Sequence, residues 1–122
     1  MSGAPRSGPA LDPAVIENLR QLTPPGEPDV LAEVLQLFLR EVPRRIARLR
    51  VAWAAGDRAE LYRAAHSLKG SAGNIGAQSL FEVCRQLDDQ ARAGDLTEAQ
   101  PLVDALDAEF ARVEVAIRQL LV

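Results

Sequence analysis

The sequence of 122 residues contains few cysteine, histidine, lysine and aromatic residues, and it has no long apolar run. A single cysteine, Cys84, excludes an internal disulfide and any metal site built from several cysteines. No apolar stretch is long enough to span a bilayer, and the start of the chain does not resemble a signal peptide. We therefore expect no membrane-embedded segment and a cytoplasmic location.

A basic surplus is also missing, because 14 lysines and arginines face 17 acidic residues and give a net charge of −3. Nucleic-acid-binding domains usually carry a basic patch, so we expect no nucleic acid as partner. The length suits one domain, and a hydrophobic content of 48% is sufficient for a core without a metal or disulfide. These numbers indicate a single globular domain.

The first residues differ in composition from the rest of the chain. Residues 1–10 are small, polar and proline-bearing, which predicts a disordered tail before a domain that covers residues 11–122. A tail that starts at Met1 favours a free-standing protein. Asp12 followed by Pro13 is typical of a helix start, and Thr23 to Gly26 ends that short helix at about Leu22.

Four longer segments then place apolar residues at steps of three and four, which is the period of an amphipathic helix. The four stripes are Leu31, Leu35, Phe38, Val42, Ile46, Leu49 and Trp53; Leu61, Ala65, Leu68, Ala72 and Ile75; Leu80, Cys84, Leu87 and Ala91; and Leu102, Leu106, Phe110, Val113, Ile117 and Leu120. No segment alternates as a strand does. The pattern predicts an all-α fold, an antiparallel up-down four-helix bundle with a short extra N-terminal helix packed across one end.

Two helix boundaries share one pattern, a glycine, an aspartate and a glutamate three residues after the aspartate. Asp57 with Glu60 and Asp95 with Glu98 both fit the logic of a capping box. The boundary at Asp95 opens the last helix, which we expect to start at Asp95, or at Thr97 because a proline at 101 follows closely.

The single histidine lies on the polar side of its predicted helix. At about 100° per residue, His66 points roughly 145° away from the apolar stripe, toward solvent, with Tyr62, Lys69, Gly70 and Gly73 on the same side. Glycine inside a helix costs about 1 kcal/mol relative to alanine, and Gly70 leaves room for another protein beside the imidazole. An exposed imidazole is largely neutral at pH 7, so its Nε2 is a nucleophile, and Lys69 supplies a charge suited to phosphate. We predict a histidine that accepts a phosphoryl group from a docked partner.

The run Ala65-His66-Ser67-Leu68-Lys69-Gly70 and the later Gly76 resemble the signature of histidine phosphotransfer (HPt) domains, His-x-Leu-Lys-Gly with a glycine six residues on. The resemblance extends from Leu11 to Val122. It implies a four-helix bundle that accepts phosphate on His66 from an aspartyl phosphate and passes it to another receiver in a phosphorelay. Lys69 then matches the cation near the phosphoryl group, Gly70 the clearance position, and Gly76 the turn between two helices.

The same resemblance suggests one further site residue. Family members often carry glutamine or glutamate 22 residues after the histidine to accept the Nδ1 proton and orient the ring, and that position is Asp88, one methylene shorter than glutamate. It reaches the ring directly or through a water, or it is a solvated surface aspartate. Four residues near His66 are candidate contacts to the partner: Tyr62, Arg63, Gly70 and Gly73. The alternative for Tyr62 is a partly exposed packing residue, and the alternative for Arg63 is a place on a solvated helix face.

The resemblance also implies the partners, which are receiver domains of response regulators or hybrid histidine kinases. Mg²⁺ is expected in the receiver, and this chain has no cofactor of its own. We expect a monomeric phosphocarrier, not an enzyme, without ATP chemistry.

Other functions fit the residues less well. The glycines at 70, 73 and 76 follow the lysine and no strand precedes them, which is unlike a nucleotide-binding loop. One histidine and one cysteine are too few for a metal site, and Cys84 falls on a core stripe, away from an outward His66. The remaining alternative is a helical-bundle adaptor or anti-kinase that docks on receivers or kinases without carrying phosphate.

Overall fold

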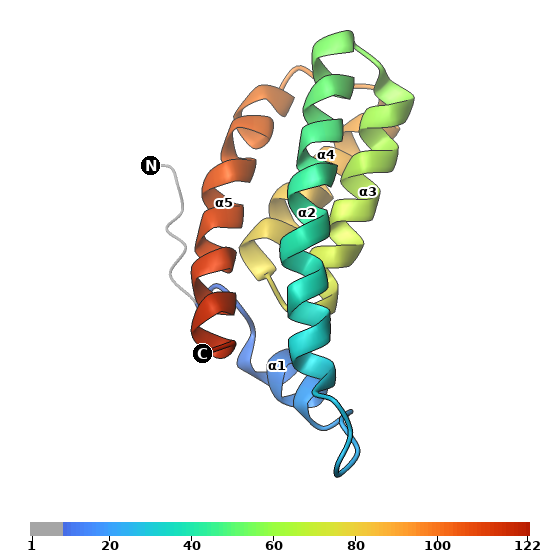
Figure 1. The fold of residues 1–122 in the computed structure, drawn as a ribbon. Coiled ribbons are helices and arrows are strands. Elements are labelled where there is room, and N and C mark those ends of the chain that lie inside the picture. The colour runs from blue at the N-terminus through green and yellow to red at the C-terminus, as the bar shows by residue number, and fades with distance from the viewer. Residues whose placement is uncertain (1–8) are drawn as a thin grey trace.

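The computed structural model describes residues 9–122, which form five α-helices and no strand. The helices are α1 (Pro13–Arg20), α2 (Val30–Ala55), α3 (Arg58–Asn74), α4 (Gln78–Ala93) and α5 (Ala99–Leu120). In Figure 1, α2 to α5 run alternately up and down, and α1 lies across the lower end of the bundle. The predicted all-α bundle with a short extra helix is confirmed. The tail expected at residues 1–10 lies, up to residue 8, outside the described residues.

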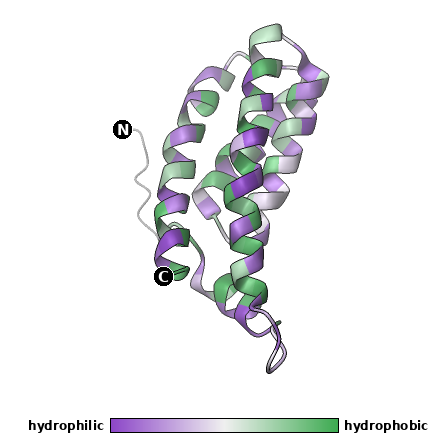
Figure 2. Ribbon diagram, viewed as in Figure 1, coloured by the Kyte–Doolittle hydropathy of each residue, from purple (hydrophilic) through white to green (hydrophobic). Residues whose placement is uncertain are grey.

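The core forms because each long helix has one apolar face. Apolar and polar residues alternate along every helix in Figure 2, and the four predicted stripes supply most of the buried side chains. Large side chains that are fully buried include Leu35, Leu49, Leu61, Leu68, Leu80, Leu87, Leu106 and Ile117. Burying each such side chain contributes about 1.5–3 kcal/mol. None of the helices in the described part of the chain is both long and apolar enough to cross a bilayer.

Aspartates begin the first three helices. The Asp12 carboxylate accepts from the backbone N–H of Ala14 at 2.9 Å, and the Asp57 carboxylate accepts from Glu60 N–H at 3.1 Å, so both predicted caps are confirmed. Asp29 caps α2 in the same way, at 3.0 Å from the N–H of Leu31. Each contact satisfies a backbone donor that the helix itself leaves without a partner.

The predicted start of the last helix at Asp95 or Thr97 is wrong, because α5 begins at Ala99. Asp95 instead closes a local turn, in which its carboxylate accepts from the N–H and hydroxyl of Thr97. Pro101 explains the shift. Proline lacks an N–H and is tolerated in the first turn of a helix, where that N–H has no helical partner, but not further inside.

The turn between α3 and α4 fixes α1 at the lower end of the bundle. Gly76 has a φ of +71°, and its carbonyl accepts from the backbone N–H of Asp12 at 2.8 Å. A Cβ at this position would come within 2.8 Å of the Asp12 Cβ and 2.9 Å of the Val15 Cβ. Both the left-handed backbone and the close approach of α1 therefore require glycine here.

Candidate functional site

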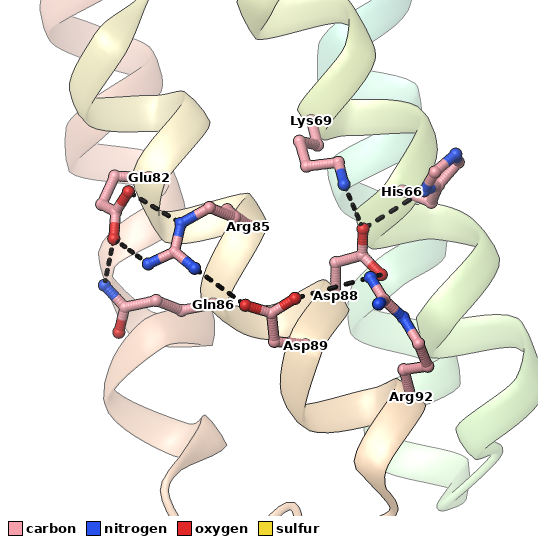
Figure 3. Close-up of polar contacts among 8 residues, drawn as sticks. All are labelled: His66, Lys69, Glu82, Arg85, Gln86, Asp88, Asp89 and Arg92. Atoms are coloured by element: carbon pink, nitrogen blue, oxygen red, sulfur yellow. Dashed lines mark hydrogen bonds and ion pairs between the residues drawn. The ribbon is translucent and has the colours of Figure 1, made fainter.

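His66 lies on the surface of α3 with 58% of its side chain exposed, as the sequence predicts. Its Nδ1 is 3.2 Å from Oδ2 of Asp88 on α4, and the ring stacks on Tyr62 with centroids 5.6 Å apart. Because a carboxylate only accepts hydrogen bonds, this contact places the ring proton on Nδ1. The unprotonated Nε2 then lies on the far side of the ring, directed away from the Asp88 contact (Figure 3).

Asp88 is fully buried, so its interpretation as a solvated surface aspartate is wrong. It lies one helical turn after Cys84 and about one turn before Ala91, on the apolar stripe of α4. Three cationic or protic groups surround its carboxylate. Lys69 Nζ is 2.6 Å from Oδ2, His66 Nδ1 contacts the same oxygen, and Arg92 Nη2 is 3.3 Å from Oδ1.

These contacts decide the charge of the buried carboxyl group. Burial by itself raises the pKa of Asp88, but hydrogen bonds from Lys69, His66 and Arg92 outweigh it and hold the pKa below the ordinary aspartate value. Asp88 is therefore a carboxylate at neutral pH. It presents a fixed negative charge to the Nδ1 side of the imidazole.

Lys69 lies beside the imidazole, but its ammonium is already engaged. The lysine and the histidine both leave α3 toward α4 and end on the same oxygen of Asp88, as Figure 3 shows. With 23% of its side chain exposed, Lys69 is partly covered. The predicted cation is next to the ring, paired in this state with a carboxylate.

The surface next to His66 is open at both candidate glycines. A Cβ added at Gly70 meets nothing within 4 Å, and one added at Gly73 meets the Phe81 ring at 3.5 Å, an ordinary contact. Both glycines are exposed within α3 and have ordinary helical backbone. The fold around them does not require glycine, and the clearance at Gly70 stays a prediction.

The remaining candidate contacts differ in their surroundings. Tyr62 is half-buried against the core and covers one face of the His66 ring. Arg63 is exposed and donates from Nε to Glu60 on the same helix at 3.0 Å. Sequence reasoning missed Arg92, although its position four residues after Asp88 is the usual spacing of a helical ion pair.

Cys84 is buried and its environment is apolar. Burial raises the pKa of the thiol to about 12, so the sulfur stays protonated and is neither an active nucleophile nor a ready metal ligand. Across residues 9–122, no three histidine, cysteine or acidic side chains are arranged to hold a metal ion.

Comparison with known proteins gives one consistent result. The model of the Hpt domain family matches residues 33–116. The structure is similar to the histidine-containing phosphotransfer protein B (HptB) of Pseudomonas aeruginosa PAO1, with 34% identity, a TM-score of 0.84, and coverage of 93% of this chain and 95% of that one. It also shares its fold with the HPT domain of a sensor hybrid histidine kinase from Shewanella, with 22% identity, a TM-score of 0.67, and coverage of 75% and 80%. No curated protein sequence matches the chain.

Proposed function

Because this chain belongs to the Hpt domain family, we propose that it is a phosphocarrier that bears its phosphoryl group on Nε2 of His66. The donor is an aspartyl phosphate on one receiver domain, and the acceptor is the aspartate of another. One observation supports this most strongly. The imidazole of His66 is exposed, its Nδ1 contacts the buried carboxylate of Asp88, and its Nε2 is directed outward.

The geometry suits nucleophilic attack without a separate base. The Nε2 lone pair forms the new bond to phosphorus while the bond from phosphorus to the receiver's aspartyl oxygen breaks, and that aspartate leaves as a carboxylate. The proton on Nδ1 stays in place, so the phosphorylated ring gains positive charge. Asp88, at 3.2 Å from Nδ1, stabilises that charge.

The surrounding residues take the roles that their positions and the resemblance suggest. Lys69 faces the phosphoryl oxygens during transfer, and Gly70 lets the receiver approach the ring without a side chain in the way. Gly73 extends the open surface, and Tyr62 and Arg63 lie at its rim as contacts to the receiver. The protein works as a cytoplasmic monomer that supplies the nucleophile and no cofactor, while the receiver supplies Mg²⁺ and the aspartate.

Transfer from a labelled receiver tests the proposal. The chain is mixed with a receiver domain that carries ³²P-labelled aspartyl phosphate, and the label is expected to move to this chain as acid-labile, base-stable phosphate. His66→Gln should take up no label and should keep its fold, because Lys69 and Arg92 still pair the buried Asp88 carboxylate in the variant. An adaptor that only docks would bind the receiver and remain unlabelled, which would refute the phosphocarrier role.

A further inference from the structure

The Asp88 carboxylate has more partners than the proposed transfer requires. Oδ2 contacts both Lys69 at 2.6 Å and His66 at 3.2 Å, while Oδ1 contacts Arg92 at 3.3 Å (Figure 3). Orienting the ring needs the histidine contact, and neutralising the phosphoryl group needs the lysine. Arg92 has no part in either step.

Lys69 faces a conflict between its present partner and its proposed one. Its ammonium makes the shortest contact to Asp88, yet it must turn to the phosphoryl oxygens when His66 is phosphorylated. Asp88 is fully buried, and a buried charge that loses its partner is strongly destabilising. Release of the lysine therefore depends on what else keeps the carboxylate paired.

Building on the proposed function, we propose that Arg92 is a positioning residue for phosphotransfer, which keeps Asp88 paired through Oδ1 while Lys69 moves from Oδ2 to the phosphoryl group. Arg92 and Asp88 are four residues apart on α4, so their contact does not involve α3, the helix that carries the lysine. Because the arginine contacts the other oxygen, departure of the lysine leaves its contact in place. The phosphorylated ring, now positive, strengthens its own bond to Oδ2.

The neighbouring charges leave Arg92 available for this role. Its second contact, to Asp89, is longer at 3.5 Å. Asp89 has a closer cation of its own, Arg85, whose Nη1 lies at 2.8 Å. The Arg92 side chain is 61% exposed, so its charge is partly screened by solvent and a moderate effect on rate is expected.

Arg92→Gln is the direct perturbation, and Arg85→Gln is its matched control. Both remove one positive charge from α4, but Arg85 contacts Glu82 and Asp89 and makes no contact with Asp88. Single-turnover transfer from a phosphorylated receiver is measured over a range of receiver concentrations, with thermal melting of each variant. At saturating receiver, we expect Arg92→Gln to slow transfer about three- to tenfold and to leave the apparent affinity within about twofold, because the lost charge is partly screened. Arg85→Gln should remain at the parent rate.

A double-mutant cycle shows whether Arg92 acts through Asp88. In an Asp88→Asn background the amide holds no charge, so Arg92→Gln should change the rate by less than about twofold. Arg92→Lys, which keeps a cation at this position, should restore most of the rate. The inference is overturned by a parent-like rate for Arg92→Gln, by a failure of Arg92→Lys to restore it, or by an equal loss in both backgrounds.

The same experiment separates failure of this inference from failure of the proposed function. A parent protein that takes no phosphoryl group from any receiver refutes the phosphocarrier role, and the Arg92 inference with it. A parent protein that transfers while Arg92→Gln transfers equally fast refutes the inference alone.

Discussion

Gly70 offers the clearest way to separate what serves the fold from what serves transfer. The position lies inside α3, its φ is not in the left-handed region, and an added Cβ meets nothing within 4 Å. Nothing in the packing opposes a side chain, so helix propensity decides the outcome. Gly70→Ala should raise the free energy of unfolding by about 1 kcal/mol, and Gly70→Gln by nearly as much, because both residues are good helix formers.

Stability and transfer should then change in opposite directions. For a domain of this size, a gain of about 1 kcal/mol raises the melting temperature by roughly 3–6 °C. A glutamine at 70 stands one turn after His66, on the same side of α3, and crowds the approaching aspartyl phosphate. We expect Gly70→Gln to melt at or above the parent temperature and to accept phosphate at a sharply reduced rate from the same receiver.

Thermal melting and single-turnover phosphotransfer on one preparation check this expectation. Ala111→Gln is the control, because it adds a similar exposed side chain on α5, and it should transfer at the parent rate. If Gly70→Gln unfolds, the glycine serves the fold. If it folds and transfers normally, the receiver does not approach over this face, and the clearance interpretation fails.

Three further predictions follow from other contacts. Gly76→Ala should lower the free energy of unfolding, measured by chemical denaturation, by more than Gly26→Ala does. Both glycines have positive φ, which costs an alanine about 1–3 kcal/mol of backbone strain, but only a Cβ at position 76 would meet α1. Equal losses of stability in the two variants would contradict the close contact. Lys69→Ala should slow transfer at saturating receiver and change receiver affinity little, since its charge is proposed to act on the phosphoryl oxygens; an unchanged rate would leave it as a partner of Asp88 alone. Hydrogen bonds lower the pKa of Asp88 in the folded state despite its burial. The Asp88 carboxylate therefore stabilises the fold above about pH 4, the usual pKa of an aspartate in an unfolded chain, and this stabilisation is lost as the pH falls further. The difference in unfolding free energy between the parent and Asp88→Asn should therefore shrink between pH 7 and about pH 3, and a pH-independent difference would contradict the ionised carboxylate.

The helices could be predicted from the sequence because their causes are local. Apolar residues at steps of three and four mark the buried faces, and Asp12 and Asp57 mark two helix starts. The error at the start of α5 has a local cause too, since Asp95 closes a turn and does not cap the helix. From the sequence, Asp95 could either cap a helix or close a turn. Only the position of Pro101, which belongs in the first turn of a helix, distinguishes the two.

The site could be predicted only in part, because its contacts cross between helices. The outward direction of His66 follows from the period of α3 alone. The contact of Asp88 with Lys69 depends on how α3 and α4 are aligned, which helical periodicity does not determine. Asp88 nevertheless lies one turn after Cys84 on a core stripe, and a buried carboxylate requires a cation. That signal was present in the sequence, as was the spacing to Arg92.

Identification of the phosphorylated ring nitrogen shows whether His66 carries phosphate in the proposed geometry. After transfer from a phosphorylated receiver, ¹⁵N and ³¹P NMR of the protein with labelled histidine shows which ring nitrogen bears phosphorus and which bears the proton. Since His66 is the single histidine, its signals need no further assignment. We predict phosphorus on Nε2 and a retained proton on Nδ1, held by Asp88. Phosphorus on Nδ1, or a ring that stays unmodified while the receiver loses its phosphate to the chain, would contradict the account.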